Sequence, residues 1–157
     1  MKVPDELARL LAGRPEIGAA EQAFPFLTVD EAGFPHTALL SRAEVEVTPD
    51  GSELLAAIAS SRTRANLTRD GRAALIAVAG TIAHYAKLRV LRAIDTPAAL
   101  GCVLQVVEHK ADSLGIPLSH IGFVTTPEIS RLEDWDASER LLLKISELPR
   151  TCSLPRR

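Results

Sequence analysis

The chain has 157 residues, of which 46% are hydrophobic and 24% charged, proportions of an ordinary globular domain and not of a disordered segment. Its 18 basic and 20 acidic side chains leave a formal charge of -2, so the positive footprint of a nucleic-acid-binding protein is missing. No apolar run reaches the roughly 20 residues of a membrane span, and Asp5 and Glu6 stand where a signal peptide would be basic and then apolar. We therefore expect one cytoplasmic domain over 1–149 with a tail over 150–157, and neither nucleic acid nor membrane as a partner.

The first third of the chain contains one helical pattern and four extended ones. Leucines at helical spacing predict a helical cap over 4–13. Apolar segments separated by turn residues predict four strands: 24–29, 36–41, 45–48 and 54–59. The first two should form a β-hairpin, because Gly33 in the connection permits the backbone angles of a tight turn.

A helix and further strands follow. Ser60 and Ser61 supply an N-cap for a short polar helix over 62–70, which Gly71 closes. Three strands are expected next: 73–79, apolar enough to be buried on both faces; 81–94, with one solvent-exposed face; and 102–107. A short strand is expected after them over 121–125. Apolar residues at helical spacing before Pro149 predict one closing helix over 132–148.

These elements predict a mainly β fold. It is a small antiparallel β-barrel of six or seven strands over 22–126, with helices at both ends and one after the fourth strand. A parallel sheet would need a crossover helix after each strand, and the chain does not provide them.

Common catalytic signatures are missing from the sequence. There is no glycine-rich phosphate loop, dinucleotide fingerprint, nucleophile elbow or paired-histidine zinc motif, and no catalytic side chain can be assigned. The four histidines lack the spacing of metal ligands, so no metal is expected: His36, His84, His109 and His120.

The segment SSRTRANL at 60–67 is the most informative stretch. Two hydroxyls at a helix start gather side-chain oxygens and free backbone N–H groups around one point, where the helix dipole adds partial positive charge. Arg62 and Arg64 can add bidentate contacts to the same anion. The segment therefore indicates either a phosphate site or an ordinary capped, solvated helix.

Three features in order resemble the pyridoxamine 5'-phosphate oxidase-like superfamily of flavin-binding split barrels. They are the hairpin LTVDEAGFPH at 27–36, the segment SRTRAN at 61–66 with the RDGR step at 69–72, and the strand YAKLRVLR at 85–92. Together they cover roughly residues 22–112, and their order is more specific than any one motif.

The resemblance implies a split barrel that forms a homodimer and binds FMN at the subunit interface. The positions that match the strand along the flavin are His36, Thr37, Ala38, Leu39, Leu40 and Ser41. The phosphate grip of the family falls on Ser61, Arg62 and Thr63, and Lys87 matches a position whose side chain reaches the flavin ring.

This chain also departs from the family. Many members carry Lys where Thr63 stands, so one cation is lost from the phosphate site, and Arg64 or Lys87 would have to compensate. Nothing after Pro127 reproduces the substrate motifs of true pyridoxamine phosphate oxidases, so vitamin B6 oxidation is not expected.

Three functions remain open. The first is an FMN-dependent oxidoreductase that acts on a small molecule by hydride transfer through flavin N5. The second is a deazaflavin-dependent reductase on the same fold, in which Arg62, Arg64 and Lys87 would meet the longer acidic tail of that cofactor. The third is a non-catalytic dimer that binds a flavin or another ligand.

Overall fold

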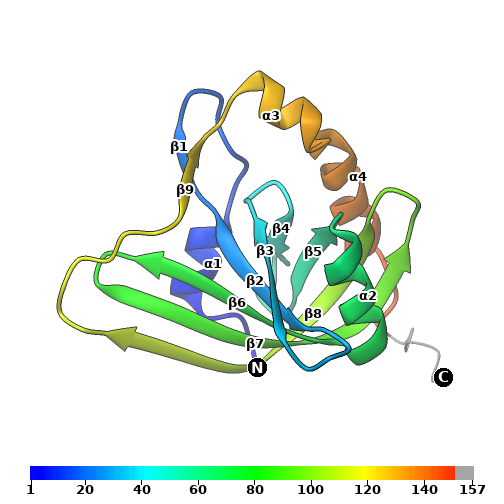
Figure 1. The fold of residues 1–157 in the computed structure, drawn as a ribbon, viewed down its shortest axis with the longest axis horizontal. Helices are drawn as coiled ribbons and strands as arrows, with labels where there is room; N and C mark the ends of the chain where they lie inside the picture. Colours follow the sequence, from blue (N-terminus) through cyan, green and yellow to red (C-terminus); the bar gives the residue numbers. More distant parts are fainter. Residues whose placement is uncertain (151–157) are drawn as a thin grey trace.

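The computed structural model describes residues 1–150, so the expected tail lies outside the described residues apart from Arg150. Figure 1 shows the elements in space. The helices are α1 (Asp5–Leu11), α2 (Ser61–Asp70), α3 (Pro127–Leu132) and α4 (Trp135–Ser146). The strands are β1 (Ala20–Gln22), β2 (Phe24–Val29), β3 (Pro35–Leu40), β4 (Val45–Val47), β5 (Leu54–Ile58), β6 (Arg72–Ala79), β7 (Ile82–Asp95), β8 (Leu100–Ser113) and β9 (Gly122–Val124).

Seven strands form one antiparallel sheet that curves into a half-barrel. Its order is β3-β2-β6-β7-β8-β5-β4, and a second sheet pairs β1 with β9. Sequence neighbours pair in the hairpins β2–β3, β4–β5, β6–β7 and β7–β8, and Gly33 has a φ of 87° in the β2–β3 turn. The mainly β split-barrel architecture is therefore confirmed, with seven strands in its main sheet.

The main core lies between α1 and the inner side of this sheet. Leu7 and Leu11 of α1 pack there with Phe24 and Phe26 of β2 and with inward-facing residues of the other strands. Burying one such side chain stabilises the fold by about 1.5–3 kcal/mol. Every second side chain of β7 packs into this core: Leu88 is buried, whereas Lys87 is exposed. The expected strand with one solvent-exposed face is therefore confirmed.

A second core lies on the outer side of the sheet, where α4 covers β5 and β8. Its buried members are Leu55, Ala57, Val103, Leu141, Leu142 and Ile145. Figure 1 shows α4 at the right of the molecule, while the long strands β6, β7 and β8 extend to the left.

Two expectations are wrong. β6 is not buried on both faces: Leu75 and Ala77 are buried but their neighbours are only half-buried, because no described helix covers the outer face of this strand. The single helix expected over 132–148 is two helices, α3 and α4, which are separated at Asp134. Asp134 has a φ of 46° and its side chain caps α4 by accepting from the Ala137 N–H, so a new helix starts there.

None of the helices within residues 1–150 is long and apolar enough to cross a bilayer.

Gly101 is where α4 lies closest to the sheet. A Cβ atom on Gly101 would lie 2.7 Å from Cγ2 of Ile145 and 2.9 Å from Cδ1 of Leu141. The substitution Gly101→Ala should therefore push α4 away and lower the free energy of unfolding by about 1–3 kcal/mol, the usual cost of overpacking. Urea unfolding of both proteins measures this loss, and an unchanged midpoint would show that α4 yields without cost.

Candidate functional site

Both ends of α2 have the expected caps. Ser60 Oγ accepts hydrogen bonds from the Thr63 N–H at 3.4 Å and from the Thr63 hydroxyl at 3.2 Å, and Gly71 ends the helix in the left-handed region with a φ of 70°. Thr63 is fully buried. Its hydroxyl is therefore occupied within the cap.

Asn66 attaches α2 to the β2–β3 hairpin. Its buried amide Nδ2 donates to Thr28 Oγ1 at 2.9 Å, and its Oδ1 accepts from Arg69 at 3.2 Å. Arg69 also donates to the Val29 carbonyl. The asparagine of the SRTRAN segment thus has an anchoring role, which holds the middle and the last turn of α2 beside the hairpin.

A groove of about 670 Å³ runs along the outer face of β2 and β6, and we call it the β2–β6 groove. It is lined by Leu27, Thr28, Val29, Asp30, Pro35, Arg69, Asp70, Arg72, Ala73, Ala74 and Lys87. Arg72 pairs with Asp70 at 2.8 Å, and Lys87 pairs with Glu108 at 2.9 Å. The groove therefore combines an apolar floor with three cationic and two anionic side chains, and two of the cations already have ion-pair partners.

A second cavity of about 440 Å³ adjoins this groove, with which it shares Asp30 and Arg69. We call it the Arg62 cavity. Its lining is Asp30, Glu31, Ala32, His36, Arg62, Ala65, Asn66 and Arg69. Within residues 1–150, buried His36 Nε2 has no hydrogen-bond partner. The fold thus brings His36 of β3 and Arg62 of α2 to one cavity.

Arg64 is engaged away from both cavities. Its guanidinium forms an ion pair with Asp95 at 2.6 Å and donates to the carbonyls of Thr96 and Pro97 at 2.6 and 3.3 Å. These contacts join α2 to the β7–β8 turn. Of the other expected site residues, Thr37, Ala38 and Ser61 do not line either cavity, although Ser61 directly precedes Arg62.

A third cavity, of about 320 Å³, lies at the far end of β3, and we call it the Trp135 cavity. Its lining comes from β3, β9, α3, α4 and the segments beside them: Ala23, Leu39, Leu40, Ser41, Glu44, Ile121, Gly122, Phe123, Ile129, Glu133 and Trp135. The expected flavin-facing residues are therefore divided between two places, with His36 at one end of β3 and Leu39, Leu40 and Ser41 at the other.

Sequence reasoning assigned no role to Arg69 or Arg72, which the groove brings together with Lys87. The available signal was the RDGR step at 69–72, which places two arginines around the end of α2 and the start of β6. Glu44, Glu133 and Trp135 had no such signal, because their meeting depends on how α3 and α4 pack.

A histidine pair lies under α1. His84 Nδ1 is 3.1 Å from His109 Nε2, the rings are stacked with centroids 5.3 Å apart, and His84 Nε2 is 3.7 Å from the Glu6 carboxylate. Within residues 1–150 no group of three or more His, Cys, Asp or Glu side chains is arranged to hold a metal. Burial lowers the pKa of His84, and the neighbouring His109 lowers it further, against the opposing effect of Glu6.

This lowered pKa predicts a pH dependence of stability. When the pKa of a histidine is lower in the folded than in the unfolded state, the neutral histidine stabilises the fold fully at pH values above the unfolded pKa of about 6.5. This stabilisation is lost as the pH falls through the folded-state pKa. Between about pH 7.5 and about pH 5.5, the protein should therefore lose more unfolding free energy than the variant His84→Gln does. Urea unfolding at both pH values measures this, with exposed His120→Gln as a control that should keep the original slope.

No family model and no curated protein matches this chain. Solved structures do match it. The styrene monooxygenase flavin reductase of Pseudomonas putida S12 is 11% identical with a TM-score of 0.51, over 69% of this chain and 94% of that one. An F420 reductase is 13% identical with a TM-score of 0.51, over 69% and 98%. HupZ of Group A Streptococcus is 15% identical with a TM-score of 0.53, over 74% and 99%. These similarities show a shared fold.

Proposed function

We propose that this protein binds FMN and acts as an oxidoreductase on a small-molecule substrate. One observation supports this above all: the β2–β6 groove has an apolar floor and adjoins the Arg62 cavity, where an arginine at the start of a helix has no ion-pair partner among the described residues. A planar apolar ring with an anionic tail has the complementary chemistry. The fold similarity to proteins named as a flavin reductase and an F420 reductase adds support.

The residues present fit such a cofactor. Arg62 lines the Arg62 cavity and has no ion pair or side-chain hydrogen bond with other described residues, so it is available to a ligand. His36 lines the same cavity, but its unpartnered Nε2 atom is buried, so this atom would meet a ligand only after the ring turns. Ser61, at the helix start, would add its hydroxyl to an anion there. Thr63 would serve through the cap that holds this helix start, and Lys87 would reach the ring only by leaving Glu108.

A bound flavin supplies hydride transfer at its N5 atom, and the protein supplies orientation and electrostatics. Leu27, Val29 and Ala74 would exclude water from the ring, while Arg62 would hold the phosphate. No side chain is assigned as a general acid or base.

A deazaflavin is the second candidate cofactor. Arg69 and Arg72 lie next to Arg62 and would suit a longer acidic tail, provided that Arg69 leaves the Val29 carbonyl and Arg72 leaves Asp70. Arg64 would contribute only by releasing Asp95.

The deciding experiment is the visible spectrum of the purified protein before and after addition of FMN and, separately, of a deazaflavin, with mass spectrometry of any released small molecule. Released FMN would support the first candidate, and released deazaflavin the second. Protein that takes up neither would contradict both. Cofactor binding without turnover, tested with NADPH or an artificial acceptor, would favour the third function, a non-catalytic binding protein.

Arg62 provides the sharpest test of the phosphate site. The variant Arg62→Ala should weaken FMN binding by about 1.5–3 kcal/mol, roughly 10- to 150-fold, since a charged hydrogen-bond donor is lost. Fluorescence titration of FMN measures the change. Arg131→Ala, on exposed α3, is the matched control and should bind FMN normally. Unchanged affinity in Arg62→Ala would refute the assignment.

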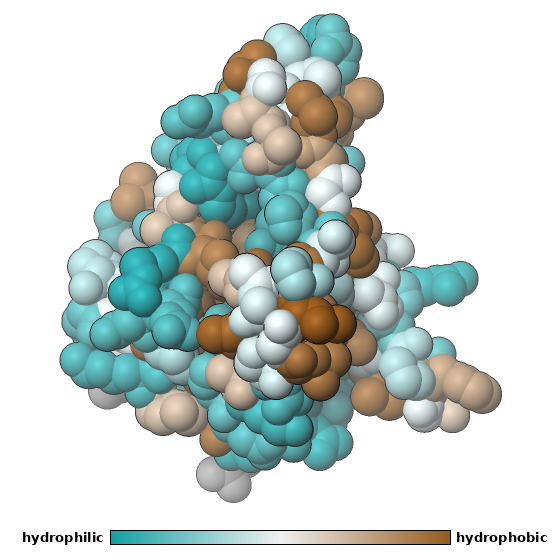
Figure 2. Space-filling view, turned by 90° about the vertical axis from the view of Figure 1, so that its left-hand side faces the viewer, coloured by the Kyte–Doolittle hydropathy of each residue, from teal (hydrophilic) through white to brown (hydrophobic). Residues whose placement is uncertain are grey.

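We also propose a cytoplasmic homodimer. Figure 2 shows apolar side chains gathered on the face at the left of Figure 1, where the segment 114–121 and β9 lie. Exposed hydrophobic side chains of that region are Leu114, Ile116, Ile121 and Val124. Exposed apolar side chains gathered on one face are typical of interfaces. Light scattering coupled to size-exclusion chromatography should give twice the 16.9 kDa chain mass, and a monomer would contradict the dimer.

A further inference from the structure

The Trp135 cavity has an unusual combination of walls. Most of its lining is apolar, and two aromatic rings, Phe123 and Trp135, lie edge to face with centroids 6.3 Å apart. Its only charged lining residues are Glu44 and Glu133, and no Lys, Arg or His of the described chain lines it. The cavity is therefore apolar, aromatic and negative.

The two carboxylates lack cationic partners among residues 1–150. Glu44 Oε2 accepts from the Ser41 N–H at 2.6 Å and from the Ser41 hydroxyl at 2.8 Å, and none of the described hydrogen bonds uses Oε1. Burial raises the pKa of Glu44, and the nearby charge of Glu133 raises it further, while the bonds from Ser41 oppose this. A cation beside both carboxylates would offset the burial and the repulsion together.

We infer that the Trp135 cavity binds a small organic cation, a protonated primary amine with an apolar body. Its ammonium group would donate charge-assisted hydrogen bonds to Glu44 and Glu133. Its apolar body would pack against Trp135 and Phe123, whose ring faces also attract a cation. A neutral or anionic molecule of the same shape would leave the carboxylates unpaired.

The cavity also adjoins the expected cofactor strand. Leu39, Leu40 and Ser41 line it and are among the positions proposed to lie along the flavin. The Trp135 cavity lies at the other end of β3 from His36 and shares no lining residue with the β2–β6 groove or the Arg62 cavity. Binding of the amine therefore does not depend on the proposed function.

Trp135 is the single tryptophan of the chain, so its fluorescence reports from the cavity wall. The test titrates the purified protein with benzylamine, and with benzyl alcohol and benzoate as neutral and anionic probes of similar size. We expect a saturable change with benzylamine, and binding of the other two weaker by about tenfold or more. The variant Glu44→Gln should weaken benzylamine binding to a similar extent, while Glu128→Gln, on α3 outside the cavity, should not.

The variant Glu44→Gln could unfold, because Glu44 holds Ser41 through two hydrogen bonds. Glu133→Gln is therefore a second variant. It should fold, because Glu133 is exposed and its side chain makes no hydrogen bond with the described residues. Equal binding of the three probes, no saturable change, or full affinity in the folded glutamate variants would overturn the inference. The titrations are run with and without FMN. Carboxylate-dependent benzylamine binding to protein that takes up no FMN would uphold the amine site and refute the proposed function, and FMN uptake without benzylamine binding would do the reverse.

Discussion

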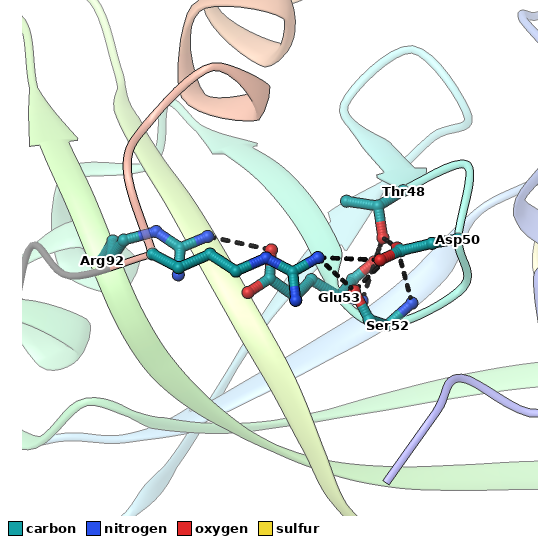
Figure 3. Close-up of polar contacts among 6 residues, drawn as sticks. Thr48, Asp50, Ser52, Glu53 and Arg92 are labelled. Atoms are coloured by element: carbon teal, nitrogen blue, oxygen red, sulfur yellow. Dashed lines mark hydrogen bonds and ion pairs between the residues drawn. The ribbon is translucent and has the colours of Figure 1, made fainter.

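Replacing Glu53 with alanine should lower the free energy of unfolding by about 3–5 kcal/mol, because it leaves Arg92 as an unpaired charge inside the protein. Arg92 on β7 is only 6% exposed, and its terminal nitrogen lies 2.9 Å from Glu53 Oε2 (Figure 3). Within the described chain, Arg92 Nε has no partner either. Without Glu53, the guanidinium would keep its desolvation cost and lose its ion pair.

The loop before Glu53 is held in place by its own hydrogen bonds. Asp50 accepts from the hydroxyls of Thr48 and Ser52 at 2.8 and 2.7 Å, and Arg150 lies 2.8 Å from its other oxygen (Figure 3). These bonds hold the pKa of Asp50 well below its usual range, the contacts from Ser52 contributing most. Glu53 therefore meets Arg92 from a loop that is already ordered.

Urea unfolding measures the loss in Glu53→Ala. The matched control is Glu46→Ala, because Glu46 pairs with Arg14 at 3.2 Å on the surface, where such a pair contributes about 0–1 kcal/mol. Adding Arg92→Met to Glu53→Ala should recover much of the stability, since the buried charge is then gone. A Glu53→Ala protein as stable as Glu46→Ala would contradict the assigned role of the pair.

The variant Arg42→Ala should cost a similar amount, about 3–5 kcal/mol, and should release β1 from the barrel. Glu21 on β1 is 7% exposed, and both of its oxygens accept from Arg42, at 2.6 and 2.9 Å. The same contact raises the pKa of Arg42. Arg42 also donates to the Ala12 carbonyl at 2.7 Å, so it joins β1 to the end of α1.

This effect should be visible locally as well as globally. β1 pairs only with β9, which carries Phe123 of the Trp135 cavity, so amide hydrogen exchange should speed up in both strands. Adding Glu21→Gln to Arg42→Ala should restore part of the protection, because no buried charge then remains. Arg89→Ala, at an exposed position of β7, is the surface control. Exchange that rises evenly over the whole sheet would show that β1 is not a separable unit.

Local signals were sufficient for most of the secondary structure. The caps of α2 follow from Ser60 and Gly71, and the β2–β3 turn from Gly33, because capping and left-handed turns depend on residues next to each other in the chain. The break at Asp134 escaped prediction, because the apolar period continues across it while the aspartate starts a new helix. The burial of β6 also escaped it, because apolar composition does not reveal whether a helix covers the strand.

The sequence by itself determined the mainly β architecture, the antiparallel hairpins and the capped start of α2 beside Arg62. These depend on hydrophobic period and on turn and cap chemistry, which act over a few residues. Only the tertiary structure decided which side chains share a cavity. Arg62 and His36 line one cavity, Glu44 and Trp135 line another, and Arg64 pairs with Asp95, because strand order and helix packing bring together residues far apart in the chain.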